Sequence, residues 1–435
     1  MTKAVLFMGD LIIVARQLRL ITEAKRRGYA PLLVITPDTD PVRFERYRAD
    51  PSHPLSLLED VVLVPEATVE HVLPAIQPLL RRYDVRAVLC IGDLFVEPVG
   101  LVGDCLGLPG TGATAARVCR NKLLQRTTLP HLSPRWIPVT PGQRSTVDAS
   151  ELRFPVVVKP VARFSSLGVR KVDDPAALPA VLATYGPDET VLVEERVVGP
   201  EFSVEALTRD GEVFWTGVTA KQTNEVDSVY FTEMGHVSPA PITPAELDAL
   251  TVANADALRK LQFRDGITHL EFRLVDGVPV LMEAAARLPG DGIMFLWELA
   301  TGQPLEPAML DLALGTPSSH PAPVRRAVQV YLEHPHGILR DVASSAAPVS
   351  WVERDARWPA FSPAPADAPP RTLAVLVTRL AGERLGPQTD SEARSTSVIL
   401  DAPLDEPIPP LVKAAADTVA VVVEPAAHGS AHGPA

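Results

Sequence analysis

The sequence predicts an α/β and α+β protein. It should have an amino-terminal domain with a doubly wound parallel sheet, a two-part α+β core and a β-rich carboxy-terminal region. Two patterns predict this fold class. Over the first hundred residues, short apolar runs alternate with helical patterns, as in a parallel sheet connected by crossover helices. In the middle of the chain, apolar strands are joined at turn dipeptides such as Asp276-Gly277, which are typical of antiparallel hairpins.

The composition is that of a globular protein without a nucleic-acid or membrane surface. The 435 residues are 46% hydrophobic and 22% charged, and the net charge is −12 at pH 7, which disfavours binding driven by phosphate neutralisation. The chain has no apolar run of the length that a transmembrane helix needs, and its apolar start is too short for a signal peptide. The three cysteines are too few and too irregularly spaced for a disulfide framework or a zinc site. We therefore expect a cytoplasmic protein.

Four apolar runs in the first hundred residues are expected to be buried strands separated by helices. The strands are expected at 4–8, 32–35, 61–64 and 87–91, and the helices at 12–27, 42–49, 68–82 and 95–106. Gly9-Asp10 and Gly92-Asp93 follow the first and fourth strands, at the edge where open α/β sheets bind ligands. Asp10 and Asp93 can equally cap the helices that follow. Because no G-x-G-x-x-G pattern follows the first strand, a dinucleotide site is not expected.

Changes of pattern along the rest of the chain predict its domain organisation. The expected parts are an α/β domain, a small core subdomain with leading helices, a large core subdomain, a β-rich domain and a disordered tail, at 1–112, 113–196, 197–320, 321–425 and 426–435. The small subdomain should begin with a helical stretch at 113–131 and a linker rich in proline, threonine and serine at 130–150. Three strands are expected at 155–159, 169–172 and 190–195, and one helix at 175–185. The β-rich domain should contain four strands, at 327–332, 348–352, 372–380 and 419–423, and an Ala/Pro loop at 359–370.

Two acids in the hairpin around Asp276-Gly277 predict a divalent cation. Side chains alternate between the faces of a strand. If the loop is the three residues 276–278, Glu271 lies directly opposite Glu283, where like charges repel. A hard cation, which binds carboxylate oxygens, would relieve this repulsion. A two-residue loop would break the register, and an exposed ladder of charges is the alternative.

Lysines at the edges of apolar segments indicate phosphate binding. Lys122 and Lys159 occupy such edges, where an ammonium is costly to bury without an anion, and phosphate is a natural partner for it. The turn that contains Ser165, Ser166 and Gly168 offers backbone N–H groups and hydroxyls that can cap phosphates. An ordinary hairpin loop is the alternative for this turn.

A carboxylate follows the next turn. The strand expected at 190–195 ends in Glu194 and Glu195, the chain turns at Gly199-Pro200, and Glu201 begins another strand. A carboxylate at such a turn can accept two hydrogen bonds from a vicinal diol such as a ribose.

Taken in order, these segments resemble the ATP-grasp superfamily over residues 1–320 and beyond. The matching motifs are Asn121-Lys122, Val157-Val158-Lys159-Pro160, Gly168-Val169, Glu194-Glu195-x-Val197-x-Gly199-x-Glu201-x-Ser203-Val204, His269-x-Glu271-Phe272 and Glu283-x-x-x-Arg287. The resemblance implies a nucleotide held between two small α+β subdomains, with ATP and Mg²⁺ as cofactors. Mn²⁺ is an alternative ion, and one or two ions are expected.

The resemblance also implies roles for individual residues. Lys122 and Lys159 would contact phosphates, and Glu271 and Glu283 would coordinate the metal. Glu195 and Val197 would hydrogen-bond the adenine through their backbone groups, with Glu194 nearby. Glu201 would bind the ribose.

The loop expected at 221–239 looks like the substrate loop of the L-amino acid ligases, the dipeptide-forming enzymes of bacterial secondary metabolism. On this resemblance, Glu233 is a candidate for binding an ammonium group, and His236 for binding the reacting carboxylate or phosphate. Arg287 would hold the transferring phosphoryl group and the oxyanion that follows, with a structural salt bridge as the alternative. Gly290 and Asp291 precede the next expected helix, whose amino terminus favours an anion.

Two departures from the family pattern concern the metal and the phosphate turn. Ala285 stands where many relatives have asparagine, which suggests that water fills the second metal position, and the phosphate turn has a single glycine.

Three functions stay open at this point. The first is an ATP-dependent carboxylate–amine ligase that joins an amino acid to a second amino acid or amine, as a homodimer. The second is a biotin-carboxylase-like or formyl-phosphate-type enzyme of the same fold, which would activate bicarbonate or formate. The third is a non-catalytic, nucleotide-binding regulator. The substrate-loop match favours the first, and neither nucleic acid nor membrane is expected as a partner.

Overall fold

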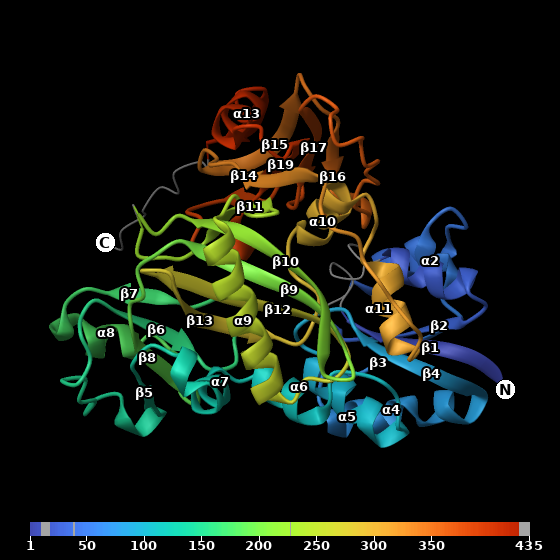
Figure 1. Ribbon diagram of the computed structural model, residues 1–435, viewed down its shortest axis with the longest axis horizontal. Helices are drawn as coiled ribbons and strands as arrows, with labels where there is room; N and C mark the ends of the chain where they lie inside the picture. Colours follow the sequence, from blue (N-terminus) through green and yellow to red (C-terminus); the bar gives the residue numbers. More distant parts are fainter. Residues whose placement is uncertain (10–17, 38–39, 227, 426–435) are drawn as a thin grey trace, which may run out of the picture.

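The computed structural model describes residues 1–9, 18–37, 40–226 and 228–425. Figure 1 shows an amino-terminal sheet at the right, a small sheet at the lower left, a large sheet between them and the carboxy-terminal strands at the top. The predictions for Asp10, for the start of the helix at 12–27 and for the tail at 426–435 lie outside the described residues. In the parts of the chain that are described, no helix has both the length and the apolar content needed to span a bilayer.

The amino-terminal sheet is parallel and covered on both faces, as predicted. Its strands are β3 (Asp60–Leu63), β2 (Ala30–Ile35), β1 (Thr2–Met8) and β4 (Tyr83–Cys90), in that spatial order. Alternate residues of β1 enter two different cores, because side chains of a strand point to opposite faces. One core includes α4 (Val69–Arg82) and α5 (Val96–Leu106), and the other includes α2 (Leu18–Arg26) and α3 (Pro41–Ala49).

The small sheet has one strand more than the sequence predicted. It is antiparallel and consists of β5 (Trp136–Val139), β8 (Val191–Glu195), β6 (Val156–Pro160) and β7 (Arg170–Val172), with α8 (Leu178–Leu182) against it. The segment at 130–150, which was predicted to be a linker, therefore contributes β5. Its short apolar run pairs with β8, and this long-range pairing overrides the loop-like composition around it.

The helical stretch predicted at 113–131 is interrupted. It forms α6 (Ala113–Cys119) and α7 (Lys122–Thr128), with Asn121 between them. Asn121 caps α7, because its side-chain oxygen accepts a hydrogen bond from the Leu124 N–H at 3.1 Å. The cap fixes Lys122 at the first position of α7.

The large sheet has nine strands and runs continuously across residue 320. In spatial order they are β13 (Val278–Ala285), β12 (Gly266–Val275), β9 (Glu201–Arg209), β10 (Glu212–Thr223), β11 (Glu233–Ser238), β14 (Arg325–Tyr331), β19 (Thr396–Pro403), β17 (Arg371–Val377) and β16 (Val349–Trp351). The helices between its strands are α9 (Pro244–Leu261), α10 (Ile293–Thr301), α11 (Glu306–Ala313) and α12 (Val352–Asp355). The boundary expected at residue 320 thus lies between strands of one sheet.

The carboxy-terminal strands also form a second, three-stranded sheet. It contains β18 (Arg384–Leu385), β15 (Gly337–Ser344) and β20 (Val419–Glu424), and α13 (Ile408–Ala416) shares its core. The predictions for this region missed β15 and β19, whereas residues 359–370 form no strand, as expected.

The hairpin of β12 and β13 has the predicted register, but a two-residue loop and a β-bulge produce this register. Its loop is Asp276-Gly277 alone, and both residues have positive φ angles, 50° and 81°, as a type I′ turn requires. This loop by itself would place Glu271 opposite Met282. A β-bulge beside Glu271 adds one residue on β13 and restores the pairing with Glu283. The prediction of facing acids is confirmed, although the loop has the two-residue length that was expected to break this register.

We predict that Gly199→Ala destabilises the protein by roughly 1–3 kcal/mol, the usual cost of overpacking. A Cβ atom at Gly199 would lie 2.1 Å from the backbone oxygen of Leu274, so the β12 backbone would have to move. The measurement is urea unfolding of the variant and of Gly142→Ala, the matched control, because a Cβ at Gly142 meets no atom within 4 Å. Equal stability of the two variants would contradict this assignment.

Candidate functional site

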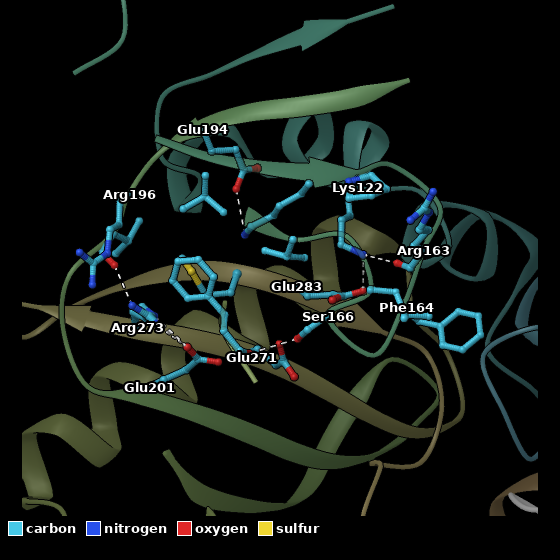
Figure 2. Close-up of a pocket in the computed structure, with 18 of the residues that line it drawn as sticks. Lys122, Arg163, Phe164, Ser166, Glu194, Arg196, Glu201, Glu271, Arg273 and Glu283 are labelled. Carbon is cyan, nitrogen blue, oxygen red and sulfur yellow. Dashed lines mark hydrogen bonds and ion pairs between the residues drawn. The ribbon is translucent and has the colours of Figure 1, made fainter. Parts of the chain in front are cut away.

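A cleft of about 760 Å³ lies between the small sheet and one end of the large sheet. Figure 2 shows Glu194 on its upper wall and Glu201 and Glu271 on its lower wall. Most of the predicted site residues line this cleft, namely Lys122, Lys159, Ser166, Glu194, Glu195, Val197, Glu201, Glu233, Glu271 and Glu283. The structure therefore brings these predicted residues together around one cleft.

The upper wall holds a buried group of three charges. The Lys159 ammonium lies 3.0 Å from a Glu194 carboxylate oxygen, and Arg126 donates two hydrogen bonds to the same carboxylate, at 2.6 and 3.2 Å. Burial would raise the pKa of Glu194, but Arg126 and Lys159 together hold that pKa at about 2. Glu194 therefore positions Lys159 in this structure. Arg126 was missed, because its helical sequence context gave no sign of a buried acidic partner.

Lys122 connects Glu283 on β13 with the turn between β6 and β7. Its ammonium lies 2.9 Å from a carboxylate oxygen of Glu283 and donates a hydrogen bond to the Arg163 carbonyl at 2.7 Å. One predicted phosphate ligand and one predicted metal ligand are thus paired with each other.

The turn between β6 and β7 has an unusual backbone. Ser165, Ser166 and Gly168 all have positive φ angles of 56°, 57° and 76°. Left-handed residues of this kind turn successive N–H groups toward one side, which makes an anion-binding concavity. The Ser166 hydroxyl donates to the Phe231 carbonyl at 3.3 Å, so this turn contacts the loop before β11.

The predicted nucleoside contacts lie beside an arginine that the sequence did not single out. Arg273 donates to Glu201 at 2.8 Å and to the Val197 carbonyl at 2.9 Å, and it also pairs with Glu225 at 2.7 Å. Burial raises the pKa of Glu201 despite this guanidinium. Glu195 is engaged differently, because its carboxylate accepts a hydrogen bond from the Arg153 N–H at 3.0 Å.

The facing acids are each neutralised by a lysine. Glu283 contacts Lys122, and Glu271 forms an ion pair with Lys221, whose side chain is fully buried at 0% exposure. Burial would raise the pKa of Glu271, but Lys221 and His269 hold that pKa well below its usual range. The repulsion expected between the two acids is thus relieved by side chains in this structure. Both acids line the cleft, and carboxylates in its wall fit a hard cation.

The region predicted as a substrate loop at 221–239 is strand at both of its ends. β10 continues to Thr223, and β11 runs from Glu233 to Ser238. Glu233 lines the cleft, whereas His236 is fully buried behind it. The His236 Nε2 lies 3.5 Å from Glu233 and 2.8 Å from Asp291. His236 was therefore expected on a loop and lies on a buried strand, from which it can act through Glu233.

Two predicted substrate residues lie behind the cleft wall or beside it. Asp291 forms a two-point ion pair with Arg394 at 2.7 and 2.9 Å. Arg287 lies 2.8 Å from Asp93 and is absent from the residues that line the cleft. Arg287 therefore forms the salt bridge that was the alternative interpretation of this residue.

Asp93 belongs to the predicted ligand edge of the amino-terminal sheet. Phe95, not Asp93, occupies the N-cap position of α5, without a side-chain cap hydrogen bond. The side chain of Asp93 instead pairs with Arg287. Gly290 has open space on its Cβ side, and its carbonyl accepts a hydrogen bond from the Ile293 N–H at 3.4 Å.

Comparisons with known proteins agree with this geometry. Residues 152–294 match the model of the ATP-grasp domain. The chain is 28% identical to dapdiamide A synthase of Enterobacter agglomerans over 261 residues, which cover 55% of this chain and 58% of that protein. It is 24% identical to alanine–anticapsin ligase of Bacillus subtilis strain 168 over 250 residues, which cover 51% and 52%. The chain spans about half the length of the curated relatives it matches.

Among solved structures, an L-amino acid ligase from Bacillus licheniformis matches with a TM-score of 0.77 at 19% identity, over 98% of this chain and 99% of that chain. The chain therefore has the ATP-grasp fold, and the predicted fold is confirmed.

We predict that Glu194 stabilises the fold in a pH-dependent way. Its folded pKa of about 2 lies below the ordinary value of 4.5, so its contribution is fully present above about pH 4.5 and is lost as the pH falls toward 2. The difference in unfolding free energy between the wild type and Glu194→Gln should therefore shrink as the pH is lowered from 5. Urea unfolding at several pH values measures it, with the exposed Glu212→Gln as control for the substitution. A difference that stays constant down to pH 3 would contradict the ion-pair account.

Proposed function

We propose that this chain is an ADP-forming carboxylate–amine ligase of secondary metabolism. It would use ATP to join the carboxylate of an amino acid to the amine of a second amino acid or another amine, through an acyl phosphate. The observation that carries the proposal is one cleft that combines Lys122 and Lys159, the facing acids Glu271 and Glu283, and Glu233. The match to an alanine–anticapsin ligase and to an L-amino acid ligase supports it.

The residues of the cleft fit a magnesium nucleotide. Glu271 and Glu283 would hold one or two Mg²⁺ ions, with Mn²⁺ as the alternative, because carboxylate oxygens are the ligands of hard cations. When bound, the ion would neutralise the charge of the phosphates during transfer. The remaining nucleotide contacts would be made by the lysines, the phosphate turn, the adenine-binding strand end and the ribose acid, namely Lys122, Lys159, Ser165, Ser166, Gly168, Glu194, Glu195, Val197 and Glu201.

The reaction needs two steps, because a carboxylate is a poor electrophile. A carboxylate oxygen first attacks the γ-phosphorus of ATP, and the bond from this phosphorus to the bridging oxygen breaks, which yields ADP and the acyl phosphate. Lys159 and Lys122 would hold the phosphates in place. The amine nitrogen then attacks the acyl carbon, the carbon–oxygen bond to phosphate breaks, and the nitrogen loses a proton. Arg287 would stabilise the oxyanion of this step after exchanging Asp93 for the substrate.

Substrate choice would depend on the group around Glu233. Its carboxylate can pair with the α-ammonium of an amino acid. His236 and Asp291 lie behind Glu233 and would fix its orientation. Gly290 would border the substrate from the opposite loop. A homodimer and a cytoplasmic location remain predictions, and three free cysteines support the second.

A screen of ADP release tests the proposal. The chain is supplied with MgATP and with amino acids singly and in pairs, and in parallel with bicarbonate and with formate. Amino-acid-dependent release with an amide of the expected mass supports the ligase. Dependence on bicarbonate or formate would favour the second function considered above, and ATP binding without turnover would favour a regulator.

We predict that Glu271→Gln and Glu283→Gln each abolish turnover and leave the fold intact. Each substitution removes a charge that would hold the metal, on a sheet whose backbone pairing does not need that charge. The measurement is ADP release at saturating Mg²⁺, with circular dichroism as the folding check and Glu212→Gln as the matched control on an exposed acid. Normal magnesium-dependent activity in both variants would refute the metal assignment.

We predict that Arg287→Ala and Glu233→Ala separate catalysis from substrate choice. Arg287→Ala should bind ATP almost normally but form amide about a hundred- to a thousandfold more slowly, the usual cost of losing one oxyanion donor. Glu233→Ala should keep its affinity for ATP but lose its preference for amino acids over their des-amino analogues. Calorimetric ATP titration and amide formation are measured for both, with Lys159→Ala as the control that should lose ATP affinity. A Glu233→Ala variant that still prefers amino acids would remove the main local support for this substrate class.

A further inference from the structure

We propose that Lys221 is a built-in cation of the cleft that takes the place of a second divalent ion, so that each chain binds one ion. The inference deepens the proposed function, because it rests on Glu271 and Glu283 as the ligands of that ion. It concerns the lower wall of the cleft, where three acids converge around a buried ammonium.

The acids form a compact group. One carboxylate oxygen from each of Glu201, Glu233 and Glu271 lies within 4.8 Å of the others. They come from three strands of the large sheet, β9, β11 and β12. Carboxylates gathered this closely repel one another unless a cation lies among them.

The Lys221 ammonium is that cation. Lys221 is on β10, directly opposite Glu201 on β9. Its side chain is fully buried, at 0% exposure, and its Nζ atom forms ion pairs with both Glu233 and Glu271. Because the ammonium is tethered to the sheet, its charge is present whether or not metal is available. The place that a second ion would need is therefore already taken.

Beyond Glu283, β13 offers no oxygen ligand at its next position on the same face. The next residue of β13 on the same face as Glu283 is Ala285, which pairs with His269 on β12. A methyl group cannot coordinate a metal. His269 is engaged at both ring nitrogens, by Glu205 at 2.8 Å and by Glu271 at 3.2 Å. What remains for a divalent ion is the pair of acids that face each other across the hairpin.

This arrangement also joins the two ends of the proposed reaction centre. Lys221 contacts Glu271, which would hold the ion, and Glu233, which would select the amino acid. A second divalent ion would reach Glu271 alone or compete for Glu233. A tethered ammonium forms ion pairs with both acids and holds Glu233 on the cleft wall.

The test counts bound ions directly. The wild-type chain is titrated with Mn²⁺ in the presence of an ATP analogue with an imido group between its β- and γ-phosphorus atoms, without amino acids, and bound Mn²⁺ is measured by electron paramagnetic resonance. We expect one Mn²⁺ per wild-type chain. We expect two in Lys221→Met, because the vacated space is lined by three carboxylates. Two ions in the wild type, or one in Lys221→Met, would overturn the proposal.

A matched double variant controls for the change of charge. Lys221→Met combined with Glu233→Gln removes one charge of each sign and one ligand, so its count should return to one. If Lys221→Met does not fold, as circular dichroism would show, the wild-type count decides alone: one ion supports the proposal and two overturn it. A count of two in a chain that forms amide contradicts this inference only. A count of one in a chain that forms no amide contradicts the ligase function only. A count of zero overturns both this inference and the assignment of Glu271 and Glu283 as metal ligands.

Discussion

The cleft depends on an alternation of acidic and basic side chains that runs across the large sheet and into the segments beside it. The series runs through Glu205, His269, Glu271, Lys221, Glu233, His236, Asp291 and Arg394, and each member contacts the next. A buried charge is costly unless it is paired, and each inner member of this series has a partner of opposite charge on both sides. This constraint fixes the acids of the cleft before any ligand arrives.

The series also explains how distant segments of the chain contribute to one centre. At one end, Glu205 accepts a hydrogen bond from the indole of Trp297 on α10 at 2.9 Å. At the other end, Arg394 lies over the ring of Tyr331, 3.8 Å from its centroid, and donates to the Glu233 carbonyl at 2.8 Å. The carboxy-terminal region thus adds strands to the sheet of the cleft, and the segment before β19 supplies the cation that ends the series. We infer that this region supports the substrate end of the centre.

The sequence predicted the residues whose signal is local. Glu271 and Glu283 were found from strand alternation and a turn dipeptide, although the register arises from a two-residue turn and a β-bulge that no pattern announced. Lys159 was found because an ammonium at the end of an apolar strand needs an anion. Its partner in this structure is Glu194, which was predicted to contact the nucleotide.

The residues that the sequence did not reveal are those whose role is defined by a distant partner. Arg126 lies 68 positions from Glu194, and Arg394 lies 103 positions from Asp291. Lys221 resembled any lysine near the end of a strand, because its burial depends on β9, β11 and β12 packing around it. The strand β5 was missed for the same reason, since only its pairing with β8 distinguishes it from a linker.

The measurement that tests the central claim most directly follows the oxygen atoms of the substrate. An amino acid that supports ADP release is labelled with oxygen-18 in its carboxylate, and the inorganic phosphate released with the amide is analysed by mass spectrometry. An acyl phosphate requires the phosphate to carry one labelled oxygen for each amide formed, because the carbon–oxygen bond breaks when the amine attacks. Phosphate without the label would contradict carboxylate activation by phosphoryl transfer in this cleft.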